Sequence, residues 1–174
     1  MPRVKGFTLI ELMIAIAILG VIVGLAAPAM SDFAVRQRVS GQASELMLAL
    51  AFARSEAVKQ NREIVLLPET NSASGWSTGW CVGPASGADE MSNCNDPDRL
   101  RDFSASTGVS ITSAFLATSP RLTFQRDGTC SLCGSNPFKV TSTGLKATGD
   151  DARCINITRQ GRASLNKITR DASC

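Results

Sequence analysis

Cysteine is the residue type in this chain that could most readily carry redox chemistry or bind a metal. All six cysteines lie between Cys81 and Cys174, and Cys130 and Cys133 form a C-x-x-C pair. That spacing occurs in redox-active disulfides and in half of a tetrahedral zinc site. Here the pair follows an Asp-Gly turn instead of opening a helix, and no histidine is available to complete a zinc site. We therefore predict a structural disulfide at this pair and no metal.

Histidine and tyrosine are both absent. The lack of histidine removes the commonest general base, the commonest metal ligand and the Ser-His and Cys-His nucleophile arrangements. We predict that the chain is not an enzyme and uses no cofactor. The net charge of +3 is too small to indicate a dedicated nucleic-acid-binding protein.

An isolated carboxylate lies in the N-terminal region. Residues 7–30 form an apolar run in which Glu11 is the only charged residue. As a helix this run is about 36 Å long, which is enough to cross a hydrocarbon layer of about 30 Å. Arg3 and Lys5 precede the run and favour a cytoplasmic N-terminus. The simplest interpretation is a single-pass anchor that places the later residues outside the cytoplasm, where disulfides persist.

Glu11 does not fit a plain anchor. A carboxylate inside the apolar layer costs about 3 kcal/mol on insertion scales. The nearest cation of the same chain is Lys5, six residues earlier. We therefore expect another molecule to supply the partner of Glu11.

Residues 5–12, with the sequence KGFTLIEL, resemble the prepilin signature of type IV pilins and type II secretion pseudopilins. The resemblance implies that residues 1–6 are a leader, which a prepilin peptidase removes between Gly6 and Phe7 before it methylates the new amino group of Phe7. It also implies that Glu11 pairs with the N-terminal amine of a neighbouring subunit during assembly. Pro28 matches the family too, and it would kink the helix because it lacks an N–H.

The pattern changes after Pro28. Residues 31–62 read as an amphipathic helix that continues the apolar one and ends near Asn61, with its apolar stripe packed on a globular domain. Residues 63–174 alternate short apolar runs with turn signals, which predicts an α+β fold. The apolar stripe of the helix consists of Val35, Val39, Ala43, Leu46, Leu50, Ala53 and Ala57. The expected strands are residues 64–67, 79–83, 109–111, 122–125, 138–141, 154–158 and 162–167. Residues 84–102 are expected to form a long surface loop.

The globular region also resembles a family, namely the GspH/FimT group of minor pilins and pseudopilins. The matching segments are RSEA at 54–57, WSTGWCV at 76–82, LTF at 122–124 with Gly128, and INITRQGR at 155–162. The resemblance implies a pilin fold, in which the second half of a long helix packs on an antiparallel sheet. The spacing of Trp76 and Trp80 favours core packing over stacking on a ligand.

The disulfide pairing is open at this stage, because six cysteines allow many combinations. Our working assignment is Cys81–Cys94, Cys130–Cys133 and Cys154–Cys174, the last of which would fix the C-terminal tail.

The C-terminal region is locally basic. Arg159 and Arg162 are candidate DNA contacts, because FimT-type pilins carry a Gly-Arg-x-Arg element associated with DNA uptake. This chain has Ser164 where the second arginine would stand, so nucleic acid is a weaker expectation than a solvated hairpin.

These observations favour a minor pilin of a type IV pilus that helps to initiate assembly at or near the tip. The alternatives are a GspH-type pseudopilin of the type II secretion system and a DNA-binding minor pilin for natural transformation. We expect a bacterial inner-membrane protein with its C-terminal domain in the periplasm. Its expected partners are the prepilin peptidase, other pilin or pseudopilin subunits, which it meets through the N-terminal helix, and the membrane.

Overall fold

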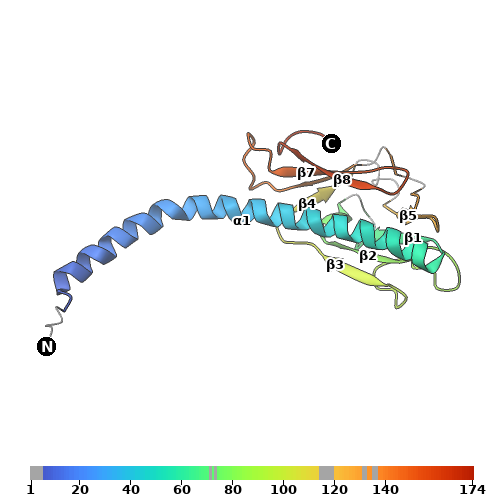
Figure 1. Cartoon of the computed structure of the whole chain (residues 1–174), viewed down its shortest axis with the longest axis horizontal. Helices are drawn as coiled ribbons and strands as arrows, with labels where there is room; N and C mark the ends of the chain where they lie inside the picture. The colour runs from blue at the N-terminus through green and yellow to red at the C-terminus, as the bar shows by residue number, and fades with distance from the viewer. Residues whose placement is uncertain (1–5, 71, 73, 114–119, 131–132, 135–136) are drawn as a thin grey trace, which may run out of the picture. The chain divides into compact units, whose positions relative to one another are not determined.

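The structure is a computed structural model that describes residues 6–70, 72, 74–113, 120–130, 133–134 and 137–174, and only the backbone of residues 26–29. The chain divides into two compact units, Met1–Ala34 and Val35–Cys174. Figure 1 shows the order of the elements, which begins with the helix α1 (Leu9–Gln60).

The first unit contains the N-terminal part of α1. Every large apolar side chain between Phe7 and Leu25 is at least 54% exposed. A helix that is apolar all round is normally covered by lipid or by other protein. Among the described residues, no single helix is long and apolar enough to cross a membrane, whereas Leu9–Leu25 and Met30–Gln60 meet that criterion together as a bent pair.

In the second unit, one face of α1 is buried against the strands. The predicted stripe is confirmed, with Val35 half-buried at its start. Small alanines within the stripe allow the sheets to approach the helix closely. The side chains that are at most 1% exposed are Val39, Ala43, Leu46, Ala49, Leu50, Ala53 and Ala57.

α1 ends in a Schellman motif. Asn61 has a φ of 49°, in the left-handed region that asparagine tolerates better than most residues. The Asn61 N–H donates to the Val58 carbonyl (3.3 Å), and the Arg62 N–H donates to the Ala57 carbonyl (3.2 Å). These two bonds satisfy carbonyls that the end of a helix would otherwise leave unpaired.

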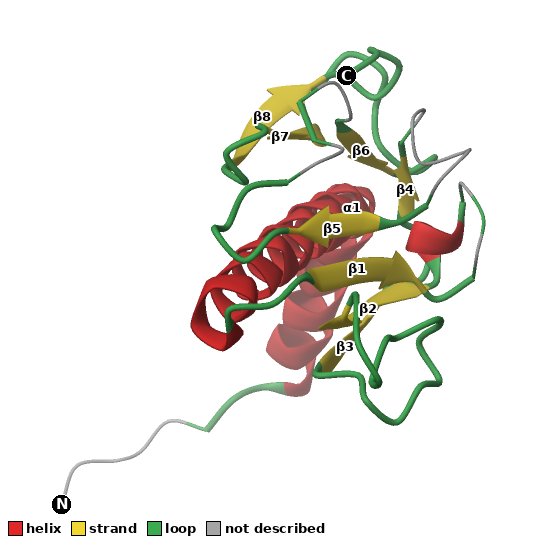
Figure 2. Cartoon of the chain, turned by 90° about the vertical axis from the view of Figure 1, so that its right-hand side faces the viewer, coloured by secondary structure: helices red, strands yellow, loops and turns green. Residues whose placement is uncertain are grey.

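The strands form two four-stranded antiparallel sheets, and Figure 2 shows α1 behind one of them and beneath the other. The first has the order β3-β2-β1-β5, and the second has the order β4-β6-β7-β8. The short helix η1 (Gly75–Ser77) precedes β2. The strands are β1 (Ile64–Pro68), β2 (Gly79–Pro84), β3 (Arg101–Ser104), β4 (Ser110–Thr112), β5 (Leu122–Phe124), β6 (Phe138–Thr141), β7 (Ala152–Ile157) and β8 (Ala163–Ile168).

Both tryptophans lie in the core, as their spacing predicted. Trp76 is fully buried and meets Phe138 edge-on, with the ring centroids 4.9 Å apart. Trp80 is 1% exposed and stacks on Phe103 at 6.0 Å. The rings therefore anchor the two sheets over the helix and leave no aromatic surface at these positions for a ligand.

The predicted α+β class is confirmed, and two details differ. We expected one antiparallel sheet, whereas the strands form two. The predicted loop at 84–102 ends in β3, whose burial pattern is one buried residue, Phe103, among three exposed ones. An edge strand of this kind lacks the repeated apolar alternation that identifies a half-buried strand in a sequence.

Gln42 is a polar residue of α1 that lies buried beside the apolar stripe. It is 2% exposed, its amide donates to the Ser104 carbonyl (3.3 Å), and its side-chain oxygen accepts from the Ser106 N–H. The side chain thus satisfies backbone groups at the end of β3 that would otherwise lie unpaired against the helix.

Candidate functional site

The start of α1 is a capping box formed by Thr8 and Glu11. Thr8 is the N-cap residue, and its Oγ1 accepts from the Glu11 N–H at 3.3 Å. Glu11 Oε2 reaches back and accepts from both the Thr8 N–H and the Thr8 Oγ1 hydroxyl, each at 3.3 Å. Two backbone donors that helix geometry leaves unpaired are therefore satisfied reciprocally.

This geometry corrects one premise of the sequence analysis. Glu11 was expected to find no partner in its own chain, yet Thr8 supplies two donors. The carboxylate also lies in the first turn of the helix, where the macrodipole favours a negative charge. The missed signal was the spacing T-x-x-E at a helix start. The pairing of Glu11 with a neighbouring subunit stays a prediction.

The predicted cleavage site lies immediately before this cap. Phe7 is 84% exposed, and Gly6 is exposed, with no described residue beyond its chain neighbours within 4 Å of a β-carbon built on it. A cut between Gly6 and Phe7 would create an amino group one residue before the N-cap. That positive charge would lie close to the end of the helix that carries Glu11. Pro28 lies inside α1, and its predicted kink stays a prediction.

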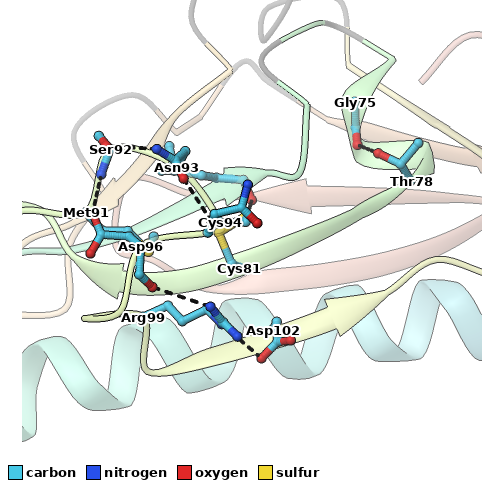
Figure 3. The surroundings of a disulfide bond; sticks show 12 residues. Gly75, Thr78, Cys81, Met91, Ser92, Asn93, Cys94, Asp96, Arg99 and Asp102 are labelled. Carbon is cyan, nitrogen blue, oxygen red and sulfur yellow. Dashed lines mark hydrogen bonds and ion pairs between the residues drawn. A yellow bond between two sulfur atoms is a disulfide. The ribbon is translucent and has the colours of Figure 1, made fainter.

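Three disulfides hold the globular unit, and they join the partners of the working assignment. Cys81–Cys94 ties the β2–β3 loop to β2, as Figure 3 shows. Cys154–Cys174 ties the C-terminal residue to β7.

The third disulfide closes the C-x-x-C pair. Cys130 and Cys133 are bonded and are 1% and 5% exposed. Their burial fits a structural bond, because a redox-active thiol needs access to its reaction partner. Among the described residues, no three His, Cys, Asp or Glu side chains gather where they could hold a metal ion.

The two candidate DNA contacts, Arg159 and Arg162, lie exposed around the turn between β7 and β8. This turn contacts the one after β5. The Cys130 N–H donates to the Arg159 carbonyl (2.8 Å), and a β-carbon on Gly161 would come within 2.2 Å of the Gly128 oxygen.

A helix side chain fixes the meeting point of these two turns. The Nε of Arg54 donates to the Gly128 carbonyl at 3.1 Å. In the sequence, Arg54 was notable only as part of the segment RSEA, which resembles the GspH/FimT group. Its role as the link between α1 and both turns depends on contacts between residues far apart in the chain.

Comparison with known proteins places the chain in a family. The family model "Type II transport protein GspH" matches residues 42–161, and the model "Prokaryotic N-terminal methylation motif" matches residues 1–27. A fimbrial protein of Pseudomonas aeruginosa is 31% identical over 135 residues, which cover 74% of this chain and 84% of the relative.

Solved structures show the same fold. The type IV minor pilin FimU of Pseudomonas aeruginosa is 25% identical with a TM-score of 0.57, over 73% of this chain and 91% of that one. The minor pseudopilin EpsH from the type II secretion system of Vibrio cholerae is 9% identical with a TM-score of 0.55, over 75% and 97% of the two chains. The chain has the pilin fold and belongs to the GspH family of type IV pilin and pseudopilin proteins, with a prokaryotic N-terminal methylation motif at its start.

Proposed function

We propose that this protein is a minor pilin of a type IV pilus, which helps to initiate assembly at or near the pilus tip. The observation that carries the proposal is the greater likeness to pilus proteins than to a secretion pseudopilin. The fimbrial relative and FimU are 31% and 25% identical to the chain, whereas EpsH is 9% identical. The alternative is a GspH-type minor pseudopilin of the type II secretion system.

The proposed assembly chemistry starts with processing. A prepilin peptidase cuts between Gly6 and Phe7 and methylates the Phe7 amine, while residues 7–30 hold the subunit in the inner membrane and the globular domain lies in the periplasm. The exposed apolar surface of α1 is then covered by lipid before assembly and by the helices of neighbouring subunits after it.

Glu11 sets the register in which neighbouring subunits associate in the filament. In the separate subunit, the bonds from Thr8 offset part of the cost of a carboxylate at the membrane. In the filament, the N-terminal amine of a neighbour adds an opposite charge, and attraction between two unit charges rises steeply where water is excluded. A subunit out of register would leave Glu11 without that charge.

The test compares Glu11→Val with Glu45→Val, in a strain that has both a pilus and a type II secretion system. Glu45 is an exposed glutamate of α1 and serves as the matched control. We expect Glu11→Val to enter the membrane and lose its leader normally, but to fail to support pili. Glu45→Val should behave as wild type. Normal piliation with Glu11→Val would refute the pairing mechanism.

Deletion of the gene decides between the two machines. The proposal predicts a loss of surface pili, counted by electron microscopy, with normal export of secreted enzymes. Loss of export with normal piliation would overturn the proposal in favour of the secretion alternative.

A DNA-binding role is a second candidate, favoured by the exposure of Arg159 and Arg162 on one turn. Such binding would be salt-sensitive because it releases counterions. The discriminating result is retardation of a duplex oligonucleotide by the full chain that is lost in Arg159→Ala and Arg162→Ala but kept in Glu11→Val. No retardation by the wild-type chain at low salt would rule this role out.

A further inference from the structure

The outer edge of β8 pairs with no other strand in the described part of the chain. β8 is the last strand of its sheet and pairs with β7 alone. At the turn, the Thr158 N–H donates to the Arg162 carbonyl (2.9 Å), which makes these two residues a hydrogen-bonded pair. Hydrogen-bonded and non-bonded pairs alternate along an antiparallel ladder. The N–H and C=O groups of Ala163, Leu165 and Lys167 therefore point away from β7, and no described residue bonds them.

The edge carries few of the usual devices that prevent strand addition. Natural edges are blunted by proline, by charges, by bulges or by shortness. β8 is six residues long, contains no proline and has Lys167 as its only charged residue. Its four central residues are exposed, and the Leu165 side chain is 36% exposed.

A groove begins where this edge starts. It has a volume of about 710 Å³ and lies between α1 and the residues that open β8. Met47, Ala51 and Val58 give the helix wall an apolar surface, and Val58 is 54% exposed. A peptide that paired with β8 would therefore have an apolar surface beside its first residues.

The charge of the groove selects its occupant. The described residues of its walls include Arg54, Lys59 and Arg162 and no carboxylate. The nearest acidic side chain on this part of α1, Glu56, is already bonded to Lys59 (3.1 Å) and Gln60 (2.7 Å). Because Glu56 and Lys59 offset each other, the net positive charge of the groove comes from Arg54 and Arg162. An acidic segment would neutralise this charge.

We propose that β8 and this groove bind an extended acidic segment of another protein chain, which adds to the sheet as a fifth strand. Main-chain hydrogen bonds to Ala163, Leu165 and Lys167 supply affinity, and side chains at alternate positions supply specificity. Apolar residues of the segment lie beside Ala163 and Leu165, and acidic residues lie beside Arg162.

Two other occupants fit the surface less well. A second copy paired edge to edge through β8 would bring Arg162 of one chain near Lys167 of the other, and like charges across a strand pair are destabilising. Single-stranded nucleic acid needs exposed aromatic rings on which bases stack, and both tryptophans are buried. Nucleic acid would also leave the row of unpaired backbone donors and acceptors of β8 unused.

The test uses the full chain in nanodiscs and two labelled heptapeptides, one alternating glutamate with valine and one alternating lysine with valine. We expect the acidic peptide alone to bind by fluorescence anisotropy. It should slow hydrogen exchange at the amides of Ala163, Leu165 and Lys167. Equal binding of both peptides, or binding that protects none of these amides, would overturn the proposal.

Variants separate charge from backbone pairing. Arg162→Glu should weaken binding of the acidic peptide about tenfold or more, whereas Arg99→Glu, on the β2–β3 loop, should leave it unchanged. Leu165→Pro removes one outward N–H while the bonds of β8 to β7 remain, so it should abolish binding with the fold intact. Fluorescence of the buried tryptophans shows whether Leu165→Pro is folded. If this variant unfolds, the comparison of Arg162→Glu with Arg99→Glu still tests the proposal.

A duplex oligonucleotide is the third probe. If the oligonucleotide binds through Arg162 and the acidic peptide does not, the proposal is wrong and the surface binds nucleic acid. These measurements do not involve the filament, so their failure would leave the proposed pilus role standing.

Discussion

Gly161→Ala tests the contact between the turn after β5, which contains Gly128, and the turn between β7 and β8. Gly161 has a φ of 72°, in the left-handed region. A β-carbon there would lie 2.2 Å from the Gly128 oxygen and 3.1 Å from the Arg54 Nε. Real β-carbons do not approach backbone oxygen so closely, so one turn must move by about 1 Å to reach ordinary van der Waals contact.

The magnitude follows from three costs. The left-handed conformation costs an alanine about 1 kcal/mol more than a glycine. Movement of the turn weakens two bonds, from Cys130 N–H to the Arg159 carbonyl and from Arg54 Nε to the Gly128 carbonyl. Each contributes about 1 kcal/mol net. The sum is about 3 kcal/mol, which lowers the Tm of a domain of this size by about 10 °C.

The assay is thermal unfolding of the full oxidised chain in detergent micelles, followed by tryptophan fluorescence. Both tryptophans of the chain are buried in the second unit, so the signal reports that unit alone. Gly41→Ala is the matched control, because Gly41 lies in α1 with nothing within 4 Å of its β-carbon position. It should gain up to about 1 kcal/mol in helix propensity. Equal Tm values for Gly161→Ala and wild type would refute the proposed contact between the turns.

Three further changes test the packing, a disulfide and a turn. Leu46→Ala removes a fully buried side chain and should cost about 2–5 kcal/mol in urea unfolding. The double variant Cys81→Ala, Cys94→Ala opens a loop of 13-residue separation and should cost about 3 kcal/mol in the same assay, with unchanged far-UV circular dichroism. Hydrogen bonds from the Thr129 hydroxyl and N–H hold the pKa of Asp127 below its ordinary value, so Thr129→Val should raise that pKa in an NMR titration. The stabilisation by this carboxylate is present above the ordinary Asp pKa of about 3.9 and is lost as the pH falls through the lower folded-state value.

The long helix and its buried face could be predicted from the sequence because their signals are local. Val39, Ala43, Leu46 and Leu50 repeat at helical spacing, and all four lie in the core. The spacing of Trp76 and Trp80 likewise predicted that both side chains are buried.

The parts that could not be predicted depend on contacts between distant residues. β3 has one buried side chain, Phe103, and it is recognisable as a strand only through its register with β2. Gln42 reads as a surface residue of a helix, and its burial follows from its bonds to Ser104 and Ser106.

At the candidate site, the cleavage, the methylation and the pairing of subunits stay predictions, and one local feature was missed. Glu11 was identified as an anomalous charge, but its bonds to Thr8 were overlooked. A capping box is a local signal at fixed spacing, so the sequence contained it.

The central claim is that the chain is processed as a prepilin, and its N-terminus tests this most directly. The measurement is intact mass and N-terminal sequencing of the protein recovered from membranes of cells with an active prepilin peptidase, with Gly6→Ala as the uncut control. We expect a chain that begins at methylated Phe7 and a Gly6→Ala variant that retains residues 1–6. A wild-type chain that still begins at Met1 would contradict the account.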